Sequence, residues 1–188
     1  MNIQKIHKLF LVSNSVSIDS RNIKPNDVFF AIKGLNFDGN KFAVQAIENG
    51  ASHVISDDLE ISKISDKIIY VNDSIQTLQE LANFHRKFIN TKIIAITGSN
   101  GKTTSKELIF SVLKSRYKTI ATKGNLNNHL GVPLTILSMN KETEIGIVEM
   151  GANHLKEIEF LCKIVEPDFG YITNFGNAHL ELSLIHIS

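Results

Sequence analysis

The sequence has little of what marks secreted or membrane proteins. It contains one cysteine and no tryptophan in 188 residues, and the single thiol of Cys162 cannot form an internal disulfide, which fits a reducing compartment. The longest apolar runs, such as residues 28–32, fall far short of the roughly twenty residues that a membrane helix needs. The apolar stretch 9–12 is also too short for a signal-peptide core. We therefore expect a cytoplasmic protein without membrane insertion.

An excess of charge of one sign is also absent. The chain has 20 lysines and arginines against 19 acidic residues, a formal net charge of +1, so no long-range field attracts nucleic acid. Apolar residues at 43% and charged residues at 21% are ordinary for globular proteins and exclude a disordered or coiled-coil chain. We expect a globular protein of one large or two small domains, with no nucleic-acid partner.

Residues 1–89 mix short strands with helices. Runs of β-branched and aromatic residues predict strands, and apolar residues at helical spacing predict helices. The expected strands are 27–32, 52–56 and 67–71, and the expected helices are 40–49 and 74–89. Asp73 or Ser74 is a plausible cap for the second helix. The polar joint at Asn90 and Thr91 then predicts a domain boundary, with a small α/β domain in residues 1–89.

Beyond this joint, strands and helices alternate regularly. The expected strands are 92–97, 119–122, 144–150 and 169–174, and the expected helices are 103–117, 128–138 and 154–165. Such alternation favours right-handed crossovers and a parallel sheet with helices on its faces. Ligands of such sheets bind at the carboxyl ends of the strands. The sequence therefore predicts a second α/β domain in residues 90–181, whereas residues 182–188 do not continue the pattern.

The strongest chemical signal is the sequence TGSNGKTT at residues 97–104, between an apolar strand and an amphipathic helix. Gly98 and Gly101 permit a tight turn that directs backbone N–H groups at phosphate oxygens, and the helix adds its positive N-terminal dipole. Lys102 supplies a cation for the outer phosphates, and the Thr103 hydroxyl can bind Mg²⁺. The expected nucleotide-binding residues are Gly98, Ser99, Asn100, Gly101, Lys102, Thr103 and Thr104. The alternative is a glycine-rich turn with a surface lysine.

A phosphate loop alone leaves kinase, GTPase, ATPase and ligase activities open. The loop is also a variant, because the strict pattern expects a glycine where Ile96 stands. Glu149 and His179 follow predicted strands and would emerge at the ligand edge of the sheet. Carboxylate and hydroxyl oxygens suit Mg²⁺, whereas an imidazole ligand is less usual for it. The candidate metal ligands are Thr103, Glu149 and His179, with a surface or supporting role as the alternative for His179.

Three groups of residues resemble the Mur ligase family, the ATP-dependent amide-bond ligases that extend the cell-wall peptide precursor. The segment DSRNIKPNDVFFAIKG at residues 19–34 looks like the family's UDP-sugar-binding domain. Residues 97–104 match the family's own shortened phosphate loop, which accounts for the missing glycine. The segments most similar to the members that add D-alanyl-D-alanine are 124–128, 131–135, 149–154, 172–174 and 178–181.

This resemblance implies a small N-terminal α/β UDP-sugar-binding domain followed by an incomplete P-loop parallel-sheet ATPase domain. It implies a ligase of peptidoglycan precursor synthesis that uses ATP and Mg²⁺ to join D-alanyl-D-alanine to UDP-N-acetylmuramoyl-tripeptide. ATP would phosphorylate the terminal carboxylate of the tripeptide, and the dipeptide amine would attack the acyl phosphate. The implied roles are catalysis for Lys102, substrate binding for Ser20, Arg21, Asn127 and Asn128, and metal binding for Thr103, Glu149 and His179. The alternative for the Ser20–Arg21 pair is a capping serine and a solvated arginine.

Family members are longer, three-domain proteins. After a segment like residues 178–181 they continue with a glycine-containing loop and a lysine that becomes carbamylated and helps to hold Mg²⁺. The resemblance ends abruptly after Glu181, so residues 182–188 are expected to be a non-native tail, with a short native terminus as the alternative. We therefore expect the chain to be an inactive fragment of a ligase that is monomeric in its full-length form. The alternative is a short nucleotide- or UDP-sugar-binding protein without ligase activity.

Overall fold

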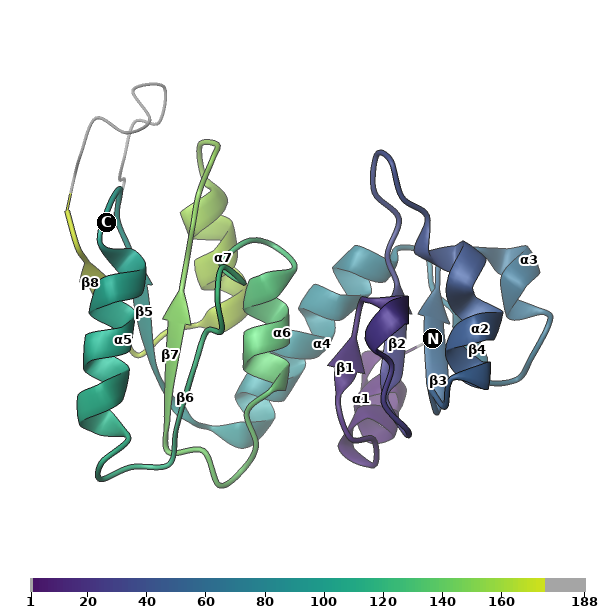
Figure 1. The fold of residues 1–188 in the computed structure, drawn as a ribbon, viewed down its shortest axis with the longest axis horizontal. Coiled ribbons are helices and arrows are strands. Elements are labelled where there is room, and N and C mark those ends of the chain that lie inside the picture. The colour runs from purple at the N-terminus through teal and green to yellow at the C-terminus, as the bar shows by residue number, and fades with distance from the viewer. Residues whose placement is uncertain (1, 175–188) are drawn as a thin grey trace. The chain divides into compact units, whose positions relative to one another are not determined.

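The computed structural model describes residues 2–174, which belong to two compact units, residues 1–84 and 85–188. Each unit is a parallel sheet with helices, so the expected α/β class is confirmed (Figure 1). The division falls inside helix α4 (Ser74–Ile89), close to the polar joint where the sequence predicts a domain boundary. That boundary stays a prediction, and the expected tail at 182–188 lies outside the described residues.

The first unit contains a four-stranded parallel sheet in the order β1-β2-β3-β4. Its strands are β1 (Val16–Ser17), β2 (Val28–Ala31), β3 (His53–Ser56) and β4 (Ile68–Tyr70). Strands that follow one another in the chain are neighbours in the sheet, so right-handed crossovers place their connections on one face. The connections are the 3₁₀ helices η1 (Ser20–Asn22) and η2 (Gly39–Phe42) and the α-helices α2 (Ala43–Glu48) and α3 (Leu59–Ser62).

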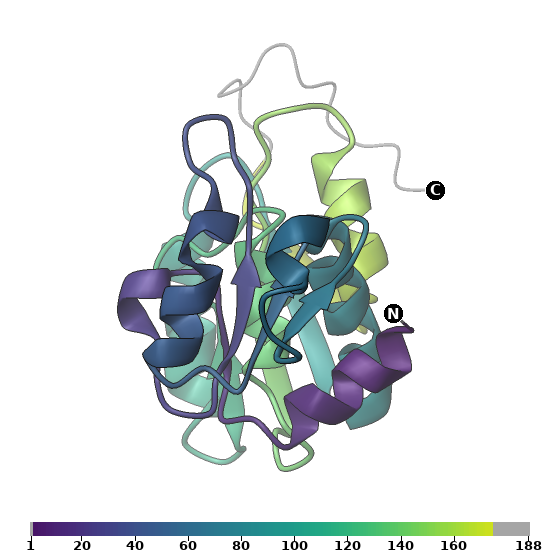
Figure 2. The same cartoon turned by 90° about the vertical axis from the view of Figure 1, so that its right-hand side faces the viewer.

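The core of this unit lies on both faces of β2, all of whose residues are buried. Phe29 and Ala31 pack in one cluster with residues of α2. Because side chains alternate along a strand, Val28 and Phe30 point to the opposite face. The helices that flank the sheet in the chain, α1 (Ile3–Leu11) and α4, contact each other where a His7 ring meets a phenylalanine ring of α4, and they contribute further buried residues. Figure 2 shows the same ribbon turned by 90° about the vertical axis, with the purple helix α1 and the blue strands and helices of this unit toward the viewer.

The second unit contains four parallel strands in the order β6-β7-β5-β8. They are β5 (Lys92–Thr97), β6 (Thr119–Ala121), β7 (Ile145–Glu149) and β8 (Phe169–Ile172), and the helices between them are α5 (Lys102–Leu113), α6 (Gly131–Leu137) and α7 (Glu157–Val165). The chain runs outward from β5 to β6 and then back through β7 to β8. Right-handed crossovers therefore place α5 on one face and both α6 and α7 on the other, as Figure 1 shows.

This topology creates a ligand edge between β5 and β7. The two strands are neighbours in the sheet, but the chain leaves β5 toward α5 and leaves β7 toward α7, on opposite faces. In open parallel sheets such a divergence opens a crevice at the carboxyl ends of the strands. The phosphate loop leaves the end of β5 and Glu149 ends β7, so both lie at this crevice.

Two helices begin later than predicted, and side-chain hydrogen bonds to the backbone lie at both starts. Helix α6 begins at Gly131 rather than at 128, because the Asn128 side chain accepts hydrogen bonds from the N–H groups of Leu130 and Gly131. Helix α7 begins at Glu157 rather than at His154, because the Glu157 carboxylate accepts two backbone N–H groups of the preceding loop. Both segments contain the expected helix, which begins three residues later than predicted.

Asp168 anchors the start of β8. Its Oδ2 accepts from Arg86 Nη2 at 2.9 Å and from the Ile93 N–H at 2.8 Å, while Oδ1 accepts from Lys92 Nζ at 2.7 Å. The Lys92 hydrogen bond leads the interactions that lower the pKa of Asp168. This carboxylate therefore joins the beginning of β8 to β5 and to the C-terminal turns of α4.

Because His85 is buried, we predict that the second unit loses stability as the pH falls below about 6.5, the ordinary pKa of histidine. The side chain is buried and its Nε2–H donates to the Met139 carbonyl at 2.9 Å. Burial lowers its pKa, so the unfolded chain binds the proton more readily than the folded chain. The stabilisation is complete above the unfolded pKa and is lost on acidification, which urea unfolding at a series of pH values would measure.

The matched control is His85→Gln, which keeps an N–H donor for Met139 and does not titrate. It should flatten the pH dependence in this range. His53→Gln is a second control, because burial also lowers the pKa of His53 in the first unit. An equally steep pH dependence in the His85→Gln protein would contradict the assignment.

Candidate functional site

The phosphate loop turns sharply at two glycines. Gly98 and Gly101 have φ angles of 137° and 78°, which side-chain-bearing residues rarely adopt. A Cβ atom at Gly98 would overlap the Thr173 side chain and crowd the backbone of Asn174, just after β8. Gly101 leads directly into α5, and no side chain caps this helix N-terminus among the described residues. The loop thus presents an uncapped helix end, which is suited to anions.

Lys102 and the backbone of the loop are already in contact. The half-buried Lys102 donates from Nζ to the carbonyls of Gly98, at 2.7 Å, and Ser99, at 3.4 Å. The N–H group of Ser99 donates to the Asn174 carbonyl at 3.4 Å, and that of Asn100 donates to Asn174 Oδ1 at 3.0 Å. The ammonium therefore lies at the loop, which is held from the end of β8.

Glu149 provides a buried carboxylate beside this loop. It lies opposite Ile96 in the sheet and is only 1% exposed. Its Oε1 accepts from Thr103 Oγ1 at 3.2 Å and from Asn127 Nδ2 at 2.9 Å. Its Oε2 is buried and has no hydrogen-bond donor within residues 2–174. The structure thus brings together Lys102, Thr103, Asn127 and Glu149, four of the predicted site residues.

The donor set fits Mg²⁺. Carboxylate and hydroxyl oxygens are the ligands that this ion prefers, and a buried oxygen without a donor is satisfied by a cation. In the described part of the chain no three His, Cys, Asp or Glu side chains gather as a metal cluster, so an ion held by Glu149 and Thr103 would complete its shell with phosphate oxygens and water. His179 lies outside the described residues.

The predicted substrate contacts of the first unit lie in η1, where Asp19 holds Arg21. Ser20 is buried in η1, and the Arg21 side chain is 85% exposed. Arg21 donates from Nε and from Nη2 to the two carboxylate oxygens of Asp19, each at 2.9 Å. These hydrogen bonds hold the pKa of Asp19 well below its usual range. Asp19 caps η1, so the alternative role of Ser20 as a capping residue is wrong. A contact of this pair with substrate stays a prediction.

Two asparagines have structural partners in the second unit. Asn127 donates to Glu149, and its side chain lies so close to Gly151 that a Cβ there would come within 3.0 Å of it. Asn128 caps α6. Substrate contacts of both residues stay predictions.

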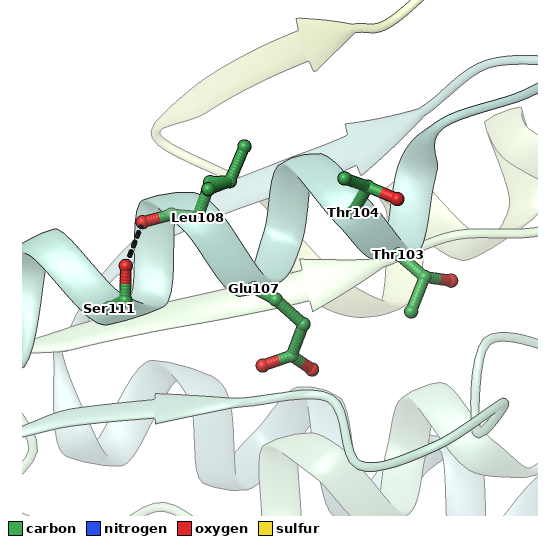
Figure 3. Close-up of a pocket in the computed structure, with 5 residues that line it drawn as sticks. All are labelled: Thr103, Thr104, Glu107, Leu108 and Ser111. Carbon is green, nitrogen blue, oxygen red and sulfur yellow. Dashed lines mark hydrogen bonds between the residues drawn. The ribbon is translucent and has the colours of Figure 1, made fainter.

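The sequence analysis missed Lys106, which is fully buried on α5 with its Nζ 3.8 Å from Glu149 Oε2. Its spacing from Thr103 and Lys102 was the available signal, since residues three and four apart share a helix face. A separate open pocket of 550 Å³ lies along the same helix (Figure 3). It is lined by Thr103, Thr104, Glu107, Leu108 and Ser111. Its lining does not include Lys102 or Glu149.

These features define a class of protein. A glycine-rich loop joins a central parallel strand to a helix, and an acidic residue ends the neighbouring strand at the same edge. This is the arrangement of nucleotide-binding α/β proteins with a phosphate loop.

Comparison with known proteins gives the family. Residues 13–89 match a model described as Mur ligase family, catalytic domain, and residues 96–184 match the Mur ligase middle domain. The chain belongs to the Mur ligase family. It is 39% identical over 171 residues to the UDP-N-acetylmuramoyl-tripeptide–D-alanyl-D-alanine ligase of Bacillus subtilis, covering 90% of this chain and 37% of that protein. It is 42% identical to the Rickettsia prowazekii ligase of the same name, covering 89% of this chain and 37% of that protein.

Solved structures agree with these relatives. The MurF ligase of Thermotoga maritima in complex with ADP superposes with a TM-score of 0.80 and 37% identity, covering 92% of this chain and 39% of that one. A MurF structure from Acinetobacter baumannii gives 0.83 and 34%, covering 97% of this chain and 42% of that one. The chain therefore spans well under half the length of the proteins that it matches.

The two glycines of the loop predict different costs of substitution. In Gly101→Ala the new Cβ atom has no neighbour within 4 Å. The substitution should lower the free energy of unfolding by about 1 kcal/mol, the cost of holding alanine in the left-handed backbone conformation. Gly98→Ala adds overlap with Thr173 and should cost about 3 kcal/mol. Urea unfolding of both variants and the unsubstituted chain measures the difference. Equal costs would show that the loop does not pack against the end of β8 as described.

Proposed function

We propose that the chain is the N-terminal and middle part of an ATP-dependent ligase that joins D-alanyl-D-alanine to UDP-N-acetylmuramoyl-tripeptide in peptidoglycan precursor synthesis. The observation that carries the proposal is identity of 36–42% to ligases of this name over about nine-tenths of the chain. The site supports the same reading, because Lys102, Thr103 and Glu149 lie together at the phosphate loop. The ADP named for the Thermotoga maritima structure supports ATP as the nucleotide.

The residues of the chain suit phosphoryl transfer to a carboxylate. Both reactants are anionic, so their approach requires positive charge and oriented N–H groups. Lys102 would contact the outer phosphates after leaving its loop carbonyls, and the first turn of α5 would contribute its N–H groups. Mg²⁺, when held by Thr103 and Glu149 together with His179, would supply further neutralisation of the phosphate oxygens. The resulting acyl phosphate gives the amide when the dipeptide amine displaces phosphate.

The remaining assignments belong to this proposal. Ser20 and Arg21 would bind the UDP-linked substrate, and Asn127 and Asn128 would contact the substrate in the second unit. In the described residues no helix is long and apolar enough to cross a membrane. We place the full-length enzyme in the cytoplasm as a monomer. The 188 residues by themselves would bind ligands without ligating them, because the proposed chemistry also draws on parts that the relatives have beyond the matched segment.

Lys102→Ala should weaken the binding of Mg²⁺–ADP by about tenfold or more, because charged hydrogen bonds to phosphate contribute roughly 1.5–3 kcal/mol. Stability should change little, since among residues 2–174 the ammonium donates only to loop carbonyls. Isothermal titration calorimetry of the chain measures the affinity. Lys114→Ala, which removes an exposed lysine at the end of the same helix, is the control and should bind normally. Equal affinity of the Lys102→Ala and unsubstituted chains would refute the role of Lys102.

The pair Ser20 and Arg21 should bind UDP-N-acetylmuramoyl-tripeptide. Asp19 engages two nitrogens of Arg21, which leaves other guanidinium donors for a phosphate or carboxylate. The double variant Ser20→Ala, Arg21→Ala should bind this substrate about tenfold more weakly in calorimetry. Lys63→Ala, which removes an exposed cation of the first unit, is the matched control. If the folded double variant binds as well as the unsubstituted chain, the contact assignment is wrong.

A further inference from the structure

Lys106 is a buried cation that the proposed chemistry does not use. Its side chain is 0% exposed on α5, one turn beyond the phosphate-loop residues Lys102 and Thr103. Removing an ammonium group from water costs several kcal/mol unless its partners compensate, and an apolar side chain would fill the same space more cheaply. The charge at this position therefore requires an explanation other than packing.

The ammonium has three oxygen neighbours at unequal distances. Nζ donates to the Thr122 carbonyl, at the end of β6, at 2.8 Å, and it lies 3.0 Å from Glu107 Oε1 on the outer side of α5. It lies 3.8 Å from Glu149 Oε2, beyond hydrogen-bond distance. The first two contacts fix the position of the ammonium, and the third is electrostatic only.

The carboxylate of Glu149 is correspondingly asymmetric. Oε1 receives two hydrogen bonds, from Thr103 and Asn127, whereas Oε2 receives none within residues 2–174. Oε2 is therefore the oxygen whose lone pairs remain for a metal ion. The positive charge of Lys106 offsets the negative charge on this oxygen, but at 3.8 Å the ammonium does not occupy its lone pairs.

A divalent cation bound to Oε2 would lie close to the Lys106 ammonium in a region of low dielectric. Two positive charges repel strongly there, so a cation arriving alone is opposed by Lys106. Nucleotide phosphates at the adjacent loop bring the negative charge that offsets this repulsion. On the basis of the proposed nucleotide site, we infer that Lys106 is a positioning residue that lowers the affinity of Glu149 for free divalent cations. The metal ion then binds together with the nucleotide.

Binding of Mn²⁺, a paramagnetic probe for the Mg²⁺ site, tests the inference. Electron paramagnetic resonance would measure free Mn²⁺ in titrations of the chain with and without ADP. Without ADP, the neutral variants Lys106→Met and Lys106→Gln should bind Mn²⁺ about tenfold more tightly than the unsubstituted chain, because they lack the repelling charge. Lys106→Arg keeps the charge and should resemble the unsubstituted chain, as should the exposed-lysine control Lys114→Gln. With ADP, the advantage of the neutral variants should shrink.

Each outcome decides the matter. Lys106→Gln retains a donor for the Thr122 carbonyl and is the variant of choice if Lys106→Met fails to fold by circular dichroism. Unchanged or weaker Mn²⁺ binding by a folded neutral variant is what a purely structural lysine predicts, and it overturns the inference. Loss of folding in both neutral variants overturns it as well. If the unsubstituted chain fails to bind ADP in the presence of Mn²⁺, the proposed nucleotide site is wrong and the inference fails with it.

Discussion

The buried carboxylate of Glu149 is the contact on which the functional edge of the second unit depends. Its Oε1 joins α5, through Thr103, to the loop before α6, through Asn127. Its backbone N–H donates to Thr122 Oγ1 at 2.9 Å, which ties the ends of β7 and β6 together. A single residue, through its side chain and its backbone N–H, therefore connects the phosphate-loop helix, two strand ends and a connecting loop.

Such an arrangement is costly as a means of stabilising a fold. Burying a carboxylate and an ammonium removes both from water, and their attraction at 3.8 Å without a hydrogen bond returns only part of that cost. The rest of the unit offsets it with apolar residues such as Ile93, Ile96 and Ile147, which have no exposed surface. A stable sheet thus supports a buried polar edge, which is the edge that the proposed function uses.

Much of the fold could be predicted from the chain alone, because long periodic segments carry their own signal. The strands at 92–97 and 144–150 and the helix at 74–89 correspond closely to β5, β7 and α4. The short elements β1 and α3 were missed, since two or four residues hold too little pattern to identify. The starts of α6 and α7 were misplaced because side chains of Asn128 and Glu157 hydrogen-bond loop N–H groups that periodicity does not reveal.

The sequence by itself determined the α/β class, the position of the phosphate loop and the candidate pair Thr103 and Glu149, because glycines, a lysine and strand ends are local features. Only the tertiary structure decided which oxygen of Glu149 lacks a donor, that Lys106 lies 3.8 Å from it, and that Asp19 holds Arg21. The contact between Asp19 and Arg21 is local in the sequence and depends on side-chain direction. The environment of Glu149 depends on strand order, which brings residues more than forty positions apart within contact distance. Local pattern carries no record of such distances, and so the electrostatic environment of the site emerged only from the folded chain.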